Sequence, residues 1–364
     1  MDAIEDIHPG DFLIIRVDEP TLSPELTDFF QEFRPIGVHF GKEAFVEDTN
    51  YENWMSAYKA LKTGVLEATG RDKMIWALDH EGGRVHRVPP PITRFSYPLN
   101  WAEQAGQMGR IFAEQLTSLG INVLFGPSLD IYSNPENKVI GPRAFGKSAV
   151  EVDEYSEAFI RAIEKKNIIP TIKHFPGHGD TLEDSHFELP ILKKDLGALE
   201  ELELLPFRYA INGGAMAVML AHILFPEIDS EYPASLSAKI AKELLRDTLN
   251  YSYVTFTDDL DMKAISERYS PEQIATQLLS CETNFAIFNH SLEHAGEVAK
   301  NLEGALKNEM SLAMPIHERT VQFMNYINQP EVDELSYSVI RSHEQFSESV
   351  PERHDIAIKE FTGD

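Results

Sequence analysis

The chain has 364 residues, a length that fits one large domain or two ordinary ones. Hydrophobic residues make up 43% of it, enough for a substantial core, so the composition excludes an intrinsically disordered chain. A formal net charge of −27 leaves no basic face to replace phosphate counterions, which argues against nucleic acid and against an anionic membrane surface as partners.

The single cysteine, Cys281, excludes an intramolecular disulfide. The first residues, Met1-Asp-Ala-Ile-Glu-Asp, lack the basic residues and the apolar run of a signal peptide. No apolar segment is long enough to span a bilayer. These features predict a soluble, cytoplasmic protein.

Short apolar runs recur along the chain, and each is followed by a longer amphipathic stretch. The runs are continuous rather than alternating, as expected for strands that are covered on both faces. The expected strands are Phe12–Val17, Ile36–Phe40, Met74–Leu78, Ile121–Phe125, Thr171–His174, Ala217–Ala221, Tyr253–Thr257 and Asn284–Phe288. The expected helices include Pro24–Phe33, Asp48–Thr69, Trp101–Leu119, Val150–Lys166, Leu196–Asn212, Ser237–Leu249 and Pro271–Cys281.

This alternation of strands and helices predicts an α/β fold, a single-domain (β/α)8 barrel of the TIM type. A doubly wound open sheet is the alternative, because periodicity does not reveal whether the sheet closes. We expect the barrel domain to occupy residues 1–345, with a closing helix at Ile316–Ile327, and residues 346–364 to form a polar C-terminal tail.

Polar side chains follow several of the expected strands at the point where each strand ends. They are Asp79–Arg87, Pro127–Asp130, Lys173 with His174, His222, and Asp258 with Asp259. Catalytic groups of such barrels gather at the carboxyl ends of the strands, so we expect these residues to form one site.

The segment from Ile172 to Pro190 is the densest in titratable groups. Three histidines and two aspartates lie between His174 and His186. Asp184, two residues before His186, can orient its imidazole, which can give a proton to a leaving group and take one from water. His174 and His178 could bind substrate or hold the loop by hydrogen bonds.

Asp258 directly follows an apolar strand, which indicates a carboxylate placed in a site. The alternative is an aspartate that caps the next helix, and this role suits Asp259 or Asp261 better.

The segment Asp79-His-Glu-Gly-Gly-Arg84 combines a carboxylate with two glycines that allow close backbone approach. Together with Arg87, Arg143 and Lys173 it offers the acceptors and fixed donors that sugar hydroxyls need. Ordinary surface ion pairs are the alternative.

A metal site is another possible interpretation of His174, His178, Asp180 and His186. The His-x3-His spacing would need a helix, which Pro176 and its neighbouring glycines preclude. We therefore expect no metal.

The run Lys173-His-Phe-Pro-Gly-His-Gly-Asp-Thr-x-x-Asp-Ser-His186 resembles the hallmark of family 3 glycoside hydrolases of the β-N-acetylhexosaminidase type. The resemblance extends from about Gly10 to Asn289. It includes the segments Leu78–Arg87, Leu119–Asp130, Asn134–Gly146, Met219–His222, Pro233–Ser237 and Phe256–Met262. Each segment is weak alone, but together and in order they are highly specific.

The resemblance implies a retaining exo-β-N-acetylglucosaminidase that removes terminal N-acetylglucosamine from muropeptides or chito-oligosaccharides. Asp258 would be the nucleophile, and His186 the acid/base oriented by Asp184. The residues that would bind the sugar are Asp79, Arg87, Arg143, Lys173 and His174. No metal or organic cofactor would be needed, and we expect a monomer.

Two segments depart from the family pattern. Ile36–Phe45 lacks the usual apolar strand followed by Arg-Asn, and Cys281–His290 carries a polar Asn284 and a terminal His290. We expect both segments on the barrel rim, where they would affect the preference for the leaving group.

Three other functions remain open alternatives. A phosphorylase could use the same dyad, because a histidine acid/base leaves less negative charge near an incoming phosphate. A metal-dependent hydrolase could use the same barrel. A non-catalytic sugar-binding protein would need Asp258 or His186 to be missing, and both are present.

Overall fold

The computed structural model describes residues 7–46, 50–181 and 189–350. Eight parallel strands close into a barrel. In order around the barrel they are β1 (Leu13–Val17), β10 (Phe285–Phe288), β9 (Val254–Asp259), β8 (Ala217–Leu220), β7 (Ile169–Phe175), β6 (Val123–Ser128), β3 (Ile75–Leu78) and β2 (Gly37–Phe40). Each predicted strand is confirmed, and the closure of the sheet excludes the open alternative. A small hairpin, β4 (His80–Gly82) with β5 (Val85–His86), extends from the end of β3.

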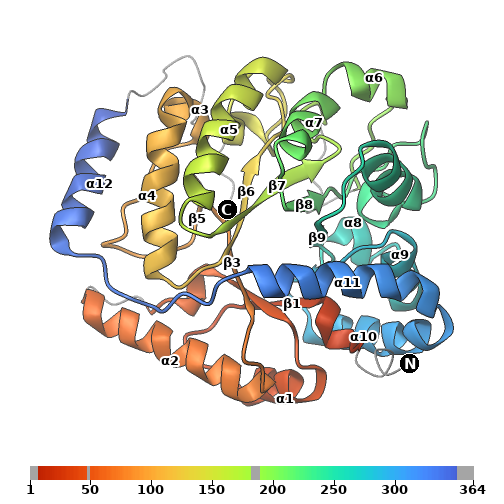
Figure 1. Cartoon of the computed structure of the whole chain (residues 1–364), viewed down its shortest axis with the longest axis horizontal. Coiled ribbons are helices and arrows are strands. Elements are labelled where there is room, and N and C mark those ends of the chain that lie inside the picture. The colour runs from red at the N-terminus through yellow and green to blue at the C-terminus, as the bar shows by residue number, and fades with distance from the viewer. Residues whose placement is uncertain (1–6, 47–49, 182–188, 351–364) are drawn as a thin grey trace.

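Helices surround the barrel (Figure 1). The helices are α1 (Pro24–Phe33), α2 (Tyr51–Thr69), α3 (Pro98–Trp101), α4 (Ala105–Ser118), α5 (Ala149–Glu164), α6 (Leu196–Glu201), α7 (Leu204–Asn212), α8 (Lys263–Ser266), α9 (Pro271–Ser280), α10 (Leu292–Asn308), α11 (Met310–Tyr326) and α12 (Tyr337–Ser349). Short 3-10 turns lie at η1 (Pro9–Phe12), η2 (Lys42–Ala44), η3 (Ala102–Gln104), η4 (Gly141–Arg143) and η5 (Ala234–Leu236), and η6 (Lys239–Thr248) is a π-helix.

Local signals explain several boundaries. The side chain of Ser23 accepts the N–H of Leu26 and so caps α1, while α2 ends at Gly70, whose φ of 61° suits glycine. The expected helix over Leu196–Asn212 is divided into α6 and α7. Pro206 accounts for the break, because a proline is tolerated in the first turn of α7 but not inside a continuous helix.

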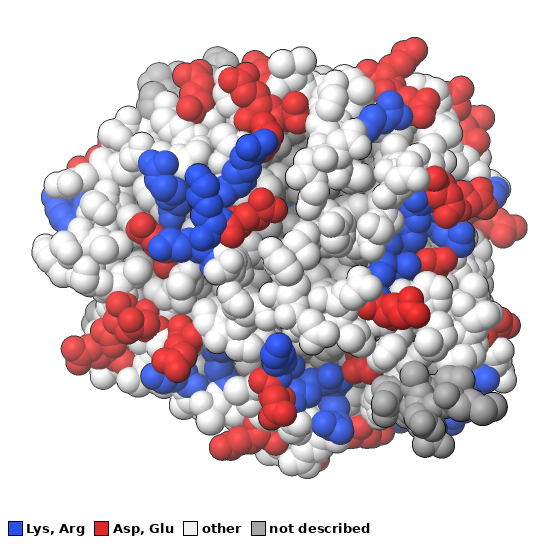
Figure 2. All heavy atoms as spheres, viewed as in Figure 1, with Lys and Arg blue, Asp and Glu red and all other residues white. Residues whose placement is uncertain are grey.

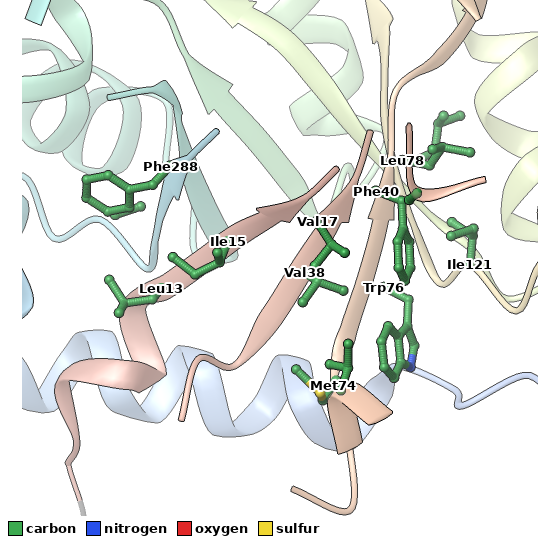
Figure 3. Packing of buried hydrophobic residues seen from close by; sticks show 14 of the residues in the cluster. Leu13, Ile15, Val17, Val38, Phe40, Met74, Trp76, Leu78, Ile121 and Phe288 are labelled. Carbon is green, nitrogen blue, oxygen red and sulfur yellow. The ribbon is translucent and has the colours of Figure 1, made fainter. Parts of the chain in front are cut away.

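The strands are apolar on both faces, which is why their sequences are continuous apolar runs. Outward side chains pack against the helices, and Phe40 stacks on Trp76 with ring centroids 5.9 Å apart (Figure 3). Inward side chains fill the barrel. Gly37 is required there, since a Cβ atom at this position would lie 2.6 Å from the side chain of Ile75 and 2.7 Å from that of Ile14.

The last helices complete the barrel. α11 crosses its amino-terminal end (Figure 1), where Phe323 packs 5.7 Å from the ring of Phe285. α12 lies beside α4, and His343 on α12 approaches Glu114 at 2.9 Å. α12 continues past residue 346, the expected start of the tail.

Figure 2 shows acidic side chains spread over the visible face, with Lys and Arg in separate groups among them. None of the helices in the described ranges has the length and apolarity needed to cross a membrane.

Candidate active site

Lys173 lies at the carboxyl end of β7 and connects two carboxylates. Its Nζ lies 2.8 Å from Oδ1 of Asp79 and 2.6 Å from Oε1 of Glu81. Asp79 directly follows β3, and Glu81 lies on the hairpin strand β4. The side chains of Lys173 and Glu81 are each only 3% exposed, so these ion pairs are shielded from water.

Arg143, from η4, completes this group. Its Nε and Nη2 each donate to one oxygen of Glu81 at 2.8 Å, a bidentate pair, and Nη1 donates to the carbonyl of Val139. The expected site includes Arg143 and Lys173 but not Glu81. Glu81 lies in the same sequence motif as Asp79. The spacing of residues in that motif does not show that Glu81 lies between two cations in the folded protein.

The charges in this group stabilise one another. Burial alone would raise the pKa of Asp79, but Lys173 holds it well below its usual range. Burial also opposes ionisation of Glu81, yet Arg143 and Lys173 lower its pKa to about 2. The two carboxylates in turn raise the pKa of Lys173 against the effect of burial. All four groups are therefore charged at neutral pH and offer fixed donors and acceptors.

Asp130, after β6, holds the loop that follows β7. Its Oδ2 lies 2.7 Å from Nδ1 of His174, and its Oδ1 accepts the backbone N–H of His178 at 2.7 Å. Ser128 donates to the same carboxylate at 2.9 Å. Burial would raise the pKa of Asp130, but His174 brings it below its usual range. Asp130 is a site residue that sequence reasoning missed, although the strand-end motif Pro127–Asp130 pointed to its position.

His178 is buried and points into this network. Its Nδ1 lies 2.7 Å from the hydroxyl of Thr181. Burial, with the neighbouring His174, lowers its pKa to about 4, so the imidazole is neutral near pH 7. The interpretation of His178 as a loop-holding residue is thus supported by two hydrogen bonds, one through its backbone and one through its ring.

Asp258 lies at the carboxyl end of β9 and is only partly buried. Its Oδ1 accepts the backbone N–H of Asp259 at 2.9 Å. Its charge acts on the pKa of His178, so it faces the same mouth of the barrel as the loop after β7. Arg87 follows β5, is partly buried, and helps to lower the pKa of Asp79.

The neighbouring acids hold the backbone, but neither caps the next helix as the alternative expected: α8 begins after Met262 with no side-chain cap. Asp259 accepts the N–H groups of Asp261 and Asn289 at 3.0 and 3.1 Å, and Asp261 accepts those of His290 and Ser291 at 2.7 and 2.9 Å. His222, which sequence analysis noted after the sixth strand, lies 2.8 Å from the carbonyl of Asp259 through its Nε2. These contacts fix the strand end that carries Asp258.

The structure therefore brings Asp79, Arg87, Lys173, Arg143 and His174 to one end of the barrel, together with Asp258. Asp184 and His186, the predicted acid/base pair, lie outside the described residues. Within the ranges that the structure describes, no group of three or more His, Cys, Asp or Glu side chains is arranged to hold a metal ion.

Comparison with known proteins identifies the family. The model of the glycosyl hydrolase family 3 N-terminal domain matches residues 38–323. The chain belongs to glycosyl hydrolase family 3. The match spans most of the barrel and the residues just described.

Similar proteins carry related names. β-Hexosaminidase A of Pseudoalteromonas piscicida is 32% identical over 302 residues, which are 77% of this chain and 50% of that protein. This chain thus spans half the length of that relative. A β-hexosaminidase of Methylobacillus flagellatus is 30% identical over 256 residues, covering 67% of this chain and 72% of the relative.

A solved structure agrees with the fold. The family 3 β-N-acetylglucosaminidase from Paenibacillus superimposes with a TM-score of 0.83 at 29% identity, covering 94% of this chain and 68% of that one. NagZ of Neisseria gonorrhoeae, solved in complex with N-trifluoroacetyl-D-glucosamine, has a TM-score of 0.71 at 25% identity, covering 93% of this chain and 95% of that one.

Proposed function

We propose that this family 3 protein is a retaining exo-β-N-acetylglucosaminidase that releases terminal, non-reducing N-acetylglucosamine from muropeptides or chito-oligosaccharides. The observation that carries the proposal is the buried group of Asp79, Glu81, Lys173 and Arg143 at the same barrel mouth as Asp258. It supplies charged, fixed hydrogen-bonding groups beside a carboxylate that is partly open to the mouth. The names of the relatives support N-acetylglucosamine as the sugar.

In the proposed mechanism, Asp258 attacks the anomeric carbon and forms a glycosyl-enzyme, while His186 gives a proton to the leaving oxygen. His186 then takes a proton from the water that resolves the intermediate, and Asp184 stabilises its cation. His178 is a poor alternative for this role, because its imidazole is neutral and engaged by Thr181. Asp79, Arg87, Arg143, Lys173 and His174 bind and orient the sugar.

The test compares aryl β-N-acetylglucosaminide with aryl β-glucoside. We expect fast release of the aryl group from the first and little from the second, unchanged by excess chelator. The same assay in phosphate and in phosphate-free buffer detects a phosphorylase, which would form the sugar 1-phosphate only in phosphate. Absence of N-acetylglucosaminide cleavage in either buffer would refute the proposed activity. The cytoplasmic location and the monomeric state stay predictions.

A further inference from the structure

The two segments that depart from the family pattern meet inside the barrel. Nδ1 of His39, on β2, lies 3.0 Å from Oδ1 of Asn289, which follows β10. His290 lies on the rim as expected, with its side chain 64% exposed, and so do the exposed Lys42 and Glu43, which follow β2. Asn284 is buried at the opposite end, where it donates to α11 through the carbonyl of Ile316. The expectation that both segments lie on the rim is therefore wrong for His39 and Asn284, because both are buried.

His39 is buried and faces Asp79, one of the proposed sugar-binding residues. Its side chain is 3% exposed, and its ring lies edge-on to Phe125 at 5.1 Å. The opposite ring atom, Nε2, lies 3.1 Å from Oδ2 of Asp79, close enough for an ion pair but bent away from ideal hydrogen-bond geometry. The contact helps to lower the pKa of Asp79.

The two oxygens of Asp79 therefore have different neighbours. Oδ1 accepts from Lys173 and Oδ2 faces His39. His39 pairs in register with Ala77, two residues before Asp79, so it lies one layer deeper in the barrel. A carboxylate held at both oxygens cannot rotate about its terminal bond without losing a contact. Its remaining lone pairs then point in fixed directions, and its side chain is 19% exposed toward the mouth.

We propose that His39 is a positioning residue for the sugar subsite: it fixes the plane of the Asp79 carboxylate, and Asn289 fixes the imidazole in turn. His39 then determines which sugar hydroxyl donates a hydrogen bond to Asp79, without touching the sugar itself. The inference rests on the proposed function only in taking Asp79 as a sugar ligand. The unusual sequence at β2 would then affect the binding of the sugar and not the preference for the leaving group.

The kinetic test uses His39→Leu, which removes the donor, and His39→Gln, whose amide nitrogen can reach the position of Nε2. His343→Leu is the matched control, since it also removes a buried histidine but lies on α12. We expect His39→Leu to raise KM and the inhibition constant of N-acetylglucosamine on the order of tenfold with a smaller change in kcat, the effect of losing one charge-assisted contact. His39→Gln should restore most of the affinity, and His343→Leu should alter stability only.

Two further measurements separate positioning from general damage. In a double-mutant cycle with Asp79→Asn, His39→Leu should add little to the loss caused by Asp79→Asn alone. Mono-deoxy aryl N-acetylglucosaminides each lack one sugar hydroxyl. The mono-deoxy substrate whose affinity is unchanged by Asp79→Asn should also bind with unchanged affinity to His39→Leu. Additive losses, an equal penalty on every deoxy substrate, or wild-type affinity in His39→Leu would overturn the proposal.

A spectroscopic test does not depend on turnover. In protein labelled with 15N-histidine, the ring signals of His39 are assigned by their absence in His39→Gln. We expect a proton on both ring nitrogens, because Nδ1 faces Oδ1 of Asn289 and Nε2 faces Oδ2 of Asp79, and both oxygens accept. We expect Asp79→Asn to shift these signals. If the wild-type protein cleaved no N-acetylglucosaminide, the proposed function would fail. This test would still show whether His39 contacts Asp79. Ring signals that ignore Asp79→Asn would refute the role of His39 even in an active enzyme.

Discussion

Asp130 holds His174 at two points, because its carboxylate lies 2.7 Å from the ring Nδ1 and also accepts the backbone N–H of the same residue at 3.3 Å. A side chain bound only through its ring could still pivot with its backbone. Here one carboxylate fixes both, and it does so where β7 ends in the cis peptide bonds Lys173–His174 and Phe175–Pro176. The orientation of His174 therefore depends on a residue that follows the neighbouring strand, β6.

Asp130→Asn should lower kcat/KM by about 10- to 100-fold, since an amide cannot accept at both of its polar atoms and charge-assisted hydrogen bonds are worth about 1.5–3 kcal/mol. Thermal unfolding of the variant should occur at a lower temperature. Ser128→Ala, which removes only one donor to Asp130, is the matched control and should have a much smaller effect. An unchanged kcat/KM in Asp130→Asn would show that His174 needs no such support.

Asp258→Ala should abolish turnover and leave the fold intact, because this carboxylate is partly exposed at the mouth. A mechanism-based fluoro-glycoside should label Asp258, as peptide mass mapping can detect. Asp259 accepts two backbone N–H groups and Glu81 is engaged by two cations, so neither is available to attack. A label on either of them would contradict the assignment of the nucleophile.

His186→Ala should separate substrates by their leaving groups. Dinitrophenyl glycosides, which need no proton on departure, should still be attacked by Asp258. Natural disaccharides should be almost inert, because their alkoxide needs a proton. The measurement is the ratio of kcat/KM values for the two substrate types in the variant and in the wild-type enzyme. Equal losses on both types would mean that His186 is not the acid.

Arg143→Met should destabilise the protein by about 3–5 kcal/mol, the usual cost of breaking one side of a buried ion pair. It leaves the buried carboxylate of Glu81 with Lys173 as its remaining cation. Urea unfolding measures the loss, and kcat/KM should also fall by roughly one to two orders of magnitude. The double variant Glu81→Gln with Arg143→Met should be less destabilised than the single one. A double variant as unstable as Arg143→Met alone would show that the loss does not arise from an uncompensated charge.

Stability should fall as the pH decreases below about 6.5 because buried histidines resist protonation. Burial lowers the pKa of His80 to about 4 and that of His86 to about 2. At these two histidines the unfolded chain therefore binds more protons than the folded one below pH 6.5. The contribution of each histidine to stability is fully present above that pH and is lost as the pH falls toward its folded pKa, by up to about 1.4 kcal/mol per pH unit.

His80→Gln is the diagnostic variant for this dependence. Gln can keep a hydrogen bond to Gln115, the partner of His80, without titrating. Asp259 acts in the opposite sense, because burial raises its pKa to about 8 and protonation then favours the folded state as the pH falls. For this reason the measurement is the slope of the free energy of unfolding against pH, obtained by urea unfolding from pH 7.5 to 5. We expect a smaller slope in His80→Gln than in the wild-type protein. Identical slopes would contradict the prediction.

The sequence predicted the barrel well because strands buried on both faces have a local signature. Inward Ile14 and outward Ile15 are both fully buried, so the run of β1 is apolar throughout. α10, a regular helix, was not among the expected helices, and the break between α6 and α7 depends on a single proline, Pro206. A helix boundary that depends on one residue is harder to predict from the sequence than a strand marked by several apolar residues.

The site was predictable where a polar residue ends an apolar run, as at Asp79, Lys173 and Asp258. It was not predictable where the function of a residue comes from a distant partner. Glu81 pairs with Arg143 across 62 positions, and His39 contacts Asn289 across 250. No spacing rule encodes such pairs, because the closure of the barrel creates them.

The group around Lys173 also has a consequence for the kind of molecule that the proposed enzyme would bind at the mouth. Its two carboxylates and two cations cancel, so a protein of net charge −27 has a locally balanced group of charges at the barrel mouth. In the proposed function, an uncharged sugar would gain strong directional hydrogen bonds there without meeting a net field, and a small anion would gain little from entering. Binding of a neutral N-acetylglucosaminide should accordingly respond weakly to ionic strength, in contrast to the surface around it, whose acidic charges salt screens.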